Sequence, residues 1–101
     1  MEALKLTDVE GQLLASPFVI LDFTSPGCAP CKKIAQALPA LLDELQPAAI
    51  KAYEVDITVA APIAARFFVL GVPTLILLKQ GKEIARFTSL PKTDAIRRLL
   101  S

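Results

Sequence analysis

The chain has 101 residues, 53% hydrophobic and 21% charged, which is enough apolar material for the core of one small domain. Its 11 basic and 10 acidic residues give a net charge of +1. They are mixed along the chain, which argues against the clustered basic surface of a nucleic-acid-binding protein. The chain has no histidine, so hydrolases built around a histidine are excluded and the commonest metal ligand is missing.

Two features of the sequence bear on location. The first ten residues lack the basic stretch and following apolar stretch of a signal peptide. The longest apolar run, Val72–Leu78, is far shorter than the roughly 18–20 residues that span a bilayer. We therefore expect a cytoplasmic protein that binds neither membrane nor nucleic acid. In such a reducing compartment a lone pair of cysteines is more often catalytic or metal-binding than structural.

The first half of the chain predicts two strands and a helix. Residues 3–7 alternate and predict a short edge strand, whereas residues 8–15 predict a short helix or a turn. Residues 18–23 are almost all apolar, as in a strand buried on both faces. A helix is expected over residues 31–45, with a kink at Pro39. Its apolar stripe consists of Ile34, Leu38, Leu41, Leu42 and Leu45.

The second half predicts three strands and two helices. A strand over residues 50–55 is followed by a helix over 59–68, which Gly71 is expected to close as a C-cap. Strands over 74–79 and 83–88 are expected to form a hairpin around the tight turn Gln80-Gly81.

A terminal helix is expected over residues 92–100. The order β-(α)-β-α-β-α-β-β-α then predicts an α/β fold. In it a mixed sheet of four or five strands has helices on both faces, with the early strands parallel and the last two antiparallel.

Both cysteines lie in the segment Cys28-Ala29-Pro30-Cys31. This segment follows the apolar strand and opens a helix. Helix N-terminal amides and the helix dipole stabilise a thiolate in that position, and the thiolate is the nucleophile in disulfide exchange. Two alternatives stay open. A structural disulfide would close too small a loop to add much stability. Half of a four-ligand zinc site would need a second chain.

Four motifs together resemble the thioredoxin family, at the family's spacing. The resemblance runs from about Ala3 to Leu100. It implies the thioredoxin fold, one thioredoxin-like domain over residues 1–101, and a cis peptide bond before Pro73. A Cys-x-Pro-Cys segment with alanine in the family's glycine position is one of the motifs. The four are Leu21-Asp22-Phe23, Cys28-Ala29-Pro30-Cys31-Lys32, Val55-Asp56 and Gly71-Val72-Pro73-Thr74.

The resemblance implies distinct roles for the two cysteines. Cys28, at the helix start with the more exposed sulfur, would attack a substrate disulfide and form a mixed disulfide. Cys31, one turn further into the helix and more buried, would attack Cys28 and release the reduced product. The redox-active disulfide Cys28–Cys31 would then serve without a bound cofactor or metal.

Asp22 lies in an apolar strand, where a buried carboxylate is costly unless paired or protonated, so its pKa is expected to rise. The resemblance implies that it exchanges a proton with Cys31 through a water. The alternative is an aspartate that faces solvent or is satisfied by a lysine. The family's buried lysine on the third strand corresponds to Ala52, and strand alternation directs Lys51 to the other face.

Substrate contacts are expected around the cysteine pair. The exposed backbone of Val72, before Pro73, would pair with an extended substrate segment. The family's tryptophan directly before the first cysteine is glycine here, and the chain has no tryptophan, so the partner range is expected to differ. The other expected contacts flank the cysteines or lie in the loop before the last helix: Gly27, Ala29, Pro30, Thr88 and Ser89.

These features predict a thiol-disulfide oxidoreductase that reduces protein disulfides, and so a role in electron transport and cell redox homeostasis. Its expected partners are disulfide-containing proteins and a thioredoxin-reductase-like electron donor, either an NADPH-dependent flavoprotein or a ferredoxin-linked enzyme. A monomer is expected. The alternative is a binding or adaptor module of the same fold whose cysteine pair gates a partner surface.

Overall fold

The computed structural model describes residues 1–101. Its five strands are β1 (Glu2–Ala3), β2 (Phe18–Thr24), β3 (Ile50–Asp56), β4 (Thr74–Lys79) and β5 (Lys82–Phe87). Its four helices are α1 (Val9–Leu13), α2 (Ala29–Glu44), α3 (Ala61–Arg66) and α4 (Thr93–Leu99). None of the helices is both long and apolar enough to cross a membrane.

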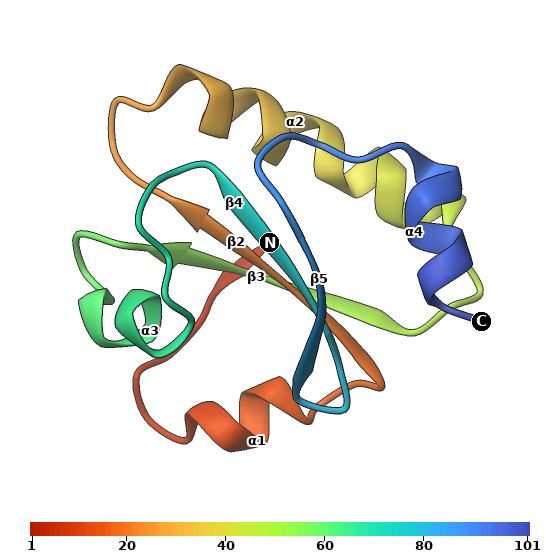
Figure 1. Ribbon diagram of the computed structural model, residues 1–101, viewed down its shortest axis with the longest axis horizontal. Helices are drawn as coiled ribbons and strands as arrows, with labels where there is room; N and C mark the ends of the chain where they lie inside the picture. The colour runs from red at the N-terminus through yellow and green to blue at the C-terminus, as the bar shows by residue number, and fades with distance from the viewer.

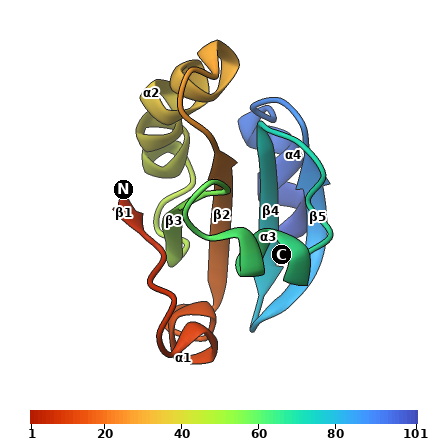
Figure 2. The same cartoon turned by 90° about the vertical axis from the view of Figure 1, so that its left-hand side faces the viewer.

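The strands form one mixed sheet in the order β1-β3-β2-β4-β5, which Figure 2 shows from one side. β3 is parallel to both β1 and β2, whereas β4 is antiparallel to β2 and β5. The predicted mixed sheet and terminal hairpin are therefore confirmed. The central position of β2 places Asp22 between Glu54 of β3 and Leu75 of β4.

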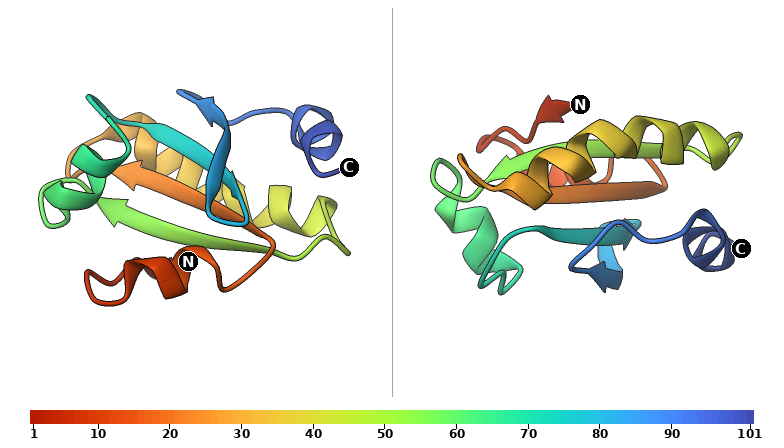
Figure 3. Two further views of the ribbon diagram at one scale, coloured as in Figure 1. Left: turned by 60° about the horizontal axis from the view of Figure 1, so that its bottom comes forward. Right: turned by 90° about the horizontal axis from the view of Figure 1, so that it is seen from above.

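Helices cover both faces of the sheet, as predicted. Figures 1 and 3 show α2 and α4 on one side and α1 and α3 on the other. Side chains of β2 alternate between the two layers: Leu21 and Phe23 belong to the core under α1 and α3, and Ile20 to the core under α2 and α4. Both faces of β2 are thus buried, which explains its nearly continuous apolar sequence. Asp22 shares the face of Ile20, under α2.

The N-terminal segment differs from the predicted strand over residues 3–7. β1 ends at Ala3. The N–H of Leu4 still donates to the carbonyl oxygen of Glu54 in β3 (2.9 Å), but from Lys5 onward the chain is held by α1. The side-chain amide of Gln12 accepts a hydrogen bond from the backbone N–H of Lys5 (2.7 Å) and donates one to its carbonyl oxygen (2.8 Å). Within residues 8–15 the helix alternative is confirmed by α1, and the side chain of Asp8 caps this helix by accepting from the N–H of Gly11.

Two helix ends also differ from the predictions. α2 begins at Ala29, two residues early, because Cys28 caps it and Pro30 is tolerated in a first turn. The helix continues without a break across Pro39. The prediction that Gly71 closes α3 is wrong. α3 ends at Arg66, and the left-handed position beyond it is taken by Phe68, with φ 54°.

Candidate active site at the start of α2

Cys28 occupies the junction between β2 and α2. It is the N-cap residue of α2, in an extended conformation, and its Sγ accepts a hydrogen bond from the backbone N–H of Cys31 at 3.2 Å. Gly27 makes the preceding turn possible with φ 79°, a conformation that costs glycine little. The Cys31 amide and the positive end of the helix dipole therefore face the Cys28 sulfur and favour its thiolate.

The two cysteines form a disulfide with their Cα atoms 5.3 Å apart. They differ in accessibility: Cys28 is half-buried, whereas Cys31 is only 2% exposed. An incoming disulfide can reach the outer sulfur and is kept from the inner one. This asymmetry fits the expected division between an attacking and a resolving cysteine.

Asp22 is buried beneath α2 without a polar partner. It is 1% exposed, and its Oδ1 atom has no hydrogen bond. The alternative of a solvent-facing or lysine-satisfied aspartate is therefore wrong. Burial is the main cause that raises the pKa of Asp22 from 3.8 to about 6, and the charge of Glu54 adds to it. A carboxylate with this pKa can gain and lose a proton near neutral pH.

The peptide bond between Val72 and Pro73 is cis, which confirms that prediction. Two hollows meet at Pro73, because Pro73 and Thr88 line both. One, of about 310 Å³, also contains Pro30 and Ser89. The other, of about 470 Å³, also contains Val72. The structure thus brings five of the expected substrate contacts together, whereas Gly27 and Ala29 adjoin them only through Cys28.

The family model for thioredoxin matches residues 3–101. The chain belongs to the thioredoxin family. It is 39% identical to a thioredoxin of Chlamydia trachomatis over 88 residues, covering 87% of this chain and 84% of that protein. It is 30% identical to Bacillus subtilis thioredoxin over 102 residues, covering 100% of this chain and 97% of the relative.

Solved structures agree on the fold. A mutant thioredoxin of Halobacterium salinarum superposes with a TM-score of 0.80 at 22% identity, over 99% of this chain and 86% of that one. Oxidised mitochondrial thioredoxin 3 of Saccharomyces cerevisiae superposes with a TM-score of 0.78 at 21% identity, over 99% of this chain and 92% of that one. With its Cys28–Cys31 disulfide, this member of the thioredoxin family is a thiol-disulfide oxidoreductase and a protein-disulfide reductase.

Glycine at position 27 is a departure from the family pattern with a structural consequence. No atom lies within 4 Å of where a Cβ would stand, so a side chain would have room. The left-handed backbone, however, strains any residue with a Cβ. The local turn is therefore built for glycine, and no aromatic surface covers this side of Cys28.

The surroundings of Asp22 also depart from the family pattern. Ala52, in the position of the family's buried lysine, supplies no charge. Lys51 instead forms an ion pair with Glu2 at 2.5 Å, as its direction in the strand predicts. The neighbour in register with Asp22 is another carboxylate, half-buried Glu54. Asp22 is thus set against a like charge, without a basic partner.

Neutralising Glu54 with Glu54→Gln is expected to lower the pKa of Asp22 from about 6 toward 3.8, because a like charge disfavours the ionised form. Burial remains, so the pKa is not expected to fall all the way. A pH titration of the Asp22 carboxyl ¹³C shift measures it. Asp43→Asn, which removes an exposed carboxylate of α2, is the control. An unchanged Asp22 pKa in Glu54→Gln would reject the coupling.

Three further residues contribute to this site and were not predicted from the sequence. Glu54 could have been found by pairing the two strands, because it stands two residues after the family's lysine position on the same face. Thr74 is buried, and its hydroxyl donates a hydrogen bond to the carbonyl oxygen of Gly71 at 2.8 Å. Phe68 is the last residue of the segment expected to be helical, but α3 ends at Arg66 and Phe68 faces solvent.

Proposed function

We propose that the natural substrates of this thioredoxin-family protein are disulfide-bonded proteins and that Cys28 is the attacking thiolate. In the dithiol form, Cys28 Sγ attacks one sulfur of the substrate disulfide. The substrate S–S bond breaks, and its second sulfur leaves as a thiolate that takes up a proton. The observation that carries this assignment is the position of Cys28 at the N-cap of α2, where the residue is half-buried and its Sγ lies 3.2 Å from the Cys31 amide nitrogen.

Cys31 completes the exchange in this proposal. Its thiol passes a proton through a water to the Asp22 carboxylate, and its sulfur attacks Cys28 Sγ. The mixed disulfide breaks, the Cys28–Cys31 disulfide forms, and the substrate leaves with two thiols. Two electrons have then moved from protein to substrate. The burial of both Cys31 and Asp22 supports this step, because it keeps the proton exchange away from bulk water.

Reduction of insulin with dithiothreitol as electron donor tests the proposal. The wild-type protein is expected to shorten the time to precipitation of the insulin B chain, and Cys28→Ser is expected to leave it at the background of dithiothreitol alone. Background activity in the wild type, with Cys28→Ser no worse, would favour the adaptor module. The feature that favours an adaptor module is the glycine at position 27, because the missing aromatic side chain beside Cys28 narrows the range of partners.

The proposal extends to the electron donor, the cellular location and the oligomeric state. An enzyme of the thioredoxin-reductase type would return electrons to the Cys28–Cys31 disulfide, and a cytoplasmic location would keep the pair reduced between turnovers. We propose a monomer that needs no cofactor beyond its own disulfide. Supplying reduced protein from NADPH with a flavoprotein reductase, or from reduced ferredoxin with its reductase, identifies the donor.

A further inference from the structure

Two apolar side chains beside the active site are far more exposed than the core requires. Leu70 is 100% and Phe68 81% exposed, the highest values among the large hydrophobic residues. Both line the 470 Å³ hollow that also contains Val72 and Pro73. We call Phe68 and Leu70 the apolar shelf. Its continuity with the cis-proline region connects it to the proposed substrate site.

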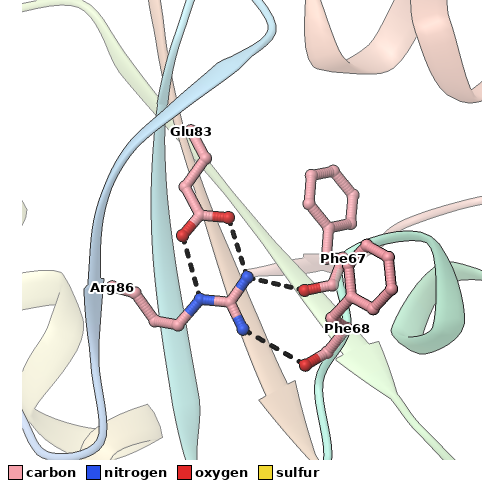
Figure 4. Close-up of polar contacts among 4 residues, drawn as sticks. All are labelled: Phe67, Phe68, Glu83 and Arg86. Carbon is pink, nitrogen blue, oxygen red and sulfur yellow. Dashed lines mark hydrogen bonds and ion pairs between the residues drawn. The ribbon is translucent and has the colours of Figure 1, made fainter.

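The shelf is held in place by a polar clamp, shown in Figure 4. The Arg86 guanidinium donates to the carbonyl oxygens of Phe67 (2.6 Å) and Phe68 (3.3 Å). Both carboxylate oxygens of Glu83 accept from the same guanidinium, at 2.7 and 2.9 Å. Phe67 packs edge-on against buried Phe23, with ring centroids 6.2 Å apart. The neighbouring Phe68, with φ 54°, is therefore presented to solvent from an anchored backbone.

The backbone next to the shelf is free to pair. Residues 70–72 belong to no strand or helix. The only hydrogen bond among their backbone groups is the one that the Gly71 carbonyl accepts from the Thr74 hydroxyl. An extended peptide can therefore bond to the N–H and C=O groups of Leu70 and Val72. In such a peptide, side chains two residues apart lie on one face about 6.6–6.8 Å from each other.

Charge in the hollow favours an apolar occupant. Arg86 is the only charged residue that lines it, and Glu83 neutralises that charge. A charged substrate side chain would gain no opposite charge there, whereas an apolar one would leave water together with Phe68 and Leu70.

We propose that the apolar shelf binds an apolar side chain of the substrate protein, on an extended segment within about two residues of the half-cystine that Cys28 attacks. The inference rests on the proposed function and narrows its substrate class. The shelf supplies the apolar contact that Gly27 does not. Specificity then comes from the loop between α3 and β4 instead of from the residue before Cys28.

The test compares wild-type protein with a Phe68→Asn, Leu70→Ser double variant on three substrates. Asparagine suits the left-handed backbone at position 68, so the variant keeps the loop conformation. The substrates are a peptide disulfide with leucine two residues from its cysteine, the same peptide with aspartate there, and bis(2-hydroxyethyl) disulfide as a reference too short to reach Leu70. The quantity compared is kcat/KM for the leucine peptide divided by kcat/KM for the reference disulfide. It is expected to fall about tenfold in the double variant.

Leu14→Ser is the matched control, because Leu14 is 57% exposed and lies in a different hollow with Pro17 and Gln80. Its ratio is expected to match the wild type. A wild type that reduces the reference but treats both peptides alike would overturn the inference and leave the proposed function standing. A wild type that reduces none of the three would overturn the function itself. A concentration-dependent dimer that the double variant abolishes would overturn the inference in favour of a second copy as occupant.

Discussion

Replacing Cys28 by serine is expected to abolish disulfide reduction, with a loss of roughly a thousandfold or more. A serine hydroxyl at the N-cap of α2 would keep the capping hydrogen bond to the Cys31 amide but is not a nucleophile toward disulfides at neutral pH. Fold and helix cap are therefore expected to survive while the chemistry is lost. The rate of insulin precipitation and far-ultraviolet circular dichroism, measured on the same sample, separate the two effects.

Cys31→Ser is the matched control, because it makes the same atomic change three residues away. Its half-exposed Cys28 still starts the exchange, but no second thiol resolves the mixed disulfide. A rapid burst of mixed-disulfide formation on Cys28, followed by arrest, is expected, in contrast to the absence of such a burst in Cys28→Ser. Equal rates of mixed-disulfide formation in the two variants would contradict the assignment of Cys28 as nucleophile.

The second large effect is on stability: Asp22→Asn is expected to stabilise the protein by up to about 3 kcal/mol at pH 7.5. That figure corresponds to the rise in the pKa of Asp22 from 3.8 to about 6 on folding. Well below pH 3.8 the carboxyl is protonated in both folded and unfolded chains, so it does not affect the free energy of unfolding. As the pH rises from 4 to 6, only the unfolded chain ionises fully and the wild type loses stability. Above pH 6 the folded chain ionises as well, and the wild type keeps the full loss in its free energy of unfolding.

Urea unfolding of the oxidised protein at pH 4 and pH 7.5 measures this difference. The gain from Asp22→Asn is expected at pH 7.5 and should shrink toward zero at pH 4, whereas the exposed Asp43→Asn should show no such dependence. Equal gains at both pH values would mean that the aspartate destabilises the fold by shape or hydrogen bonding instead of charge.

The same Asp22→Asn variant is expected to slow turnover at neutral pH by roughly a hundredfold, the usual contribution of a positioned acid–base group. An amide cannot take the proton from Cys31, so the step that releases substrate is the one affected. The pH–rate profile is the measurement. Rates that match the wild type at every pH would reject the proton-transfer role of Asp22.

Local patterns account for what could be predicted. The apolar run of β2 and the hairpin turn at Gln80-Gly81 need only their own residues, and both are present. The cis bond before Pro73 followed from a motif, not from the residue, because most bonds before proline are trans. The fold class followed from the order of these elements along the chain.

Features that depend on distant partners could not be read from the sequence. Just beyond the end of α3 at Arg66, the carbonyl oxygens of Phe67 and Phe68 are bonded by Arg86, which lies 20 residues after Arg66 in the chain. The charge that faces Asp22 depends on the register between β2 and β3, and a shift of one residue would have put Tyr53 there instead of Glu54. Nothing in the local sequence around Phe68 distinguishes an exposed shelf from a buried helix end.

The most direct test of the account is to identify which sulfur carries the substrate. Reduced Cys31→Ser protein is mixed with the disulfide of a model peptide, the reaction is stopped with acid, and the adduct is located by mass spectrometry of proteolytic fragments. We expect a stable mixed disulfide on Cys28, and an adduct at Cys31 of the reduced Cys28→Ser protein that forms far more slowly. An adduct at Cys31 that forms as fast as the one at Cys28 would contradict it.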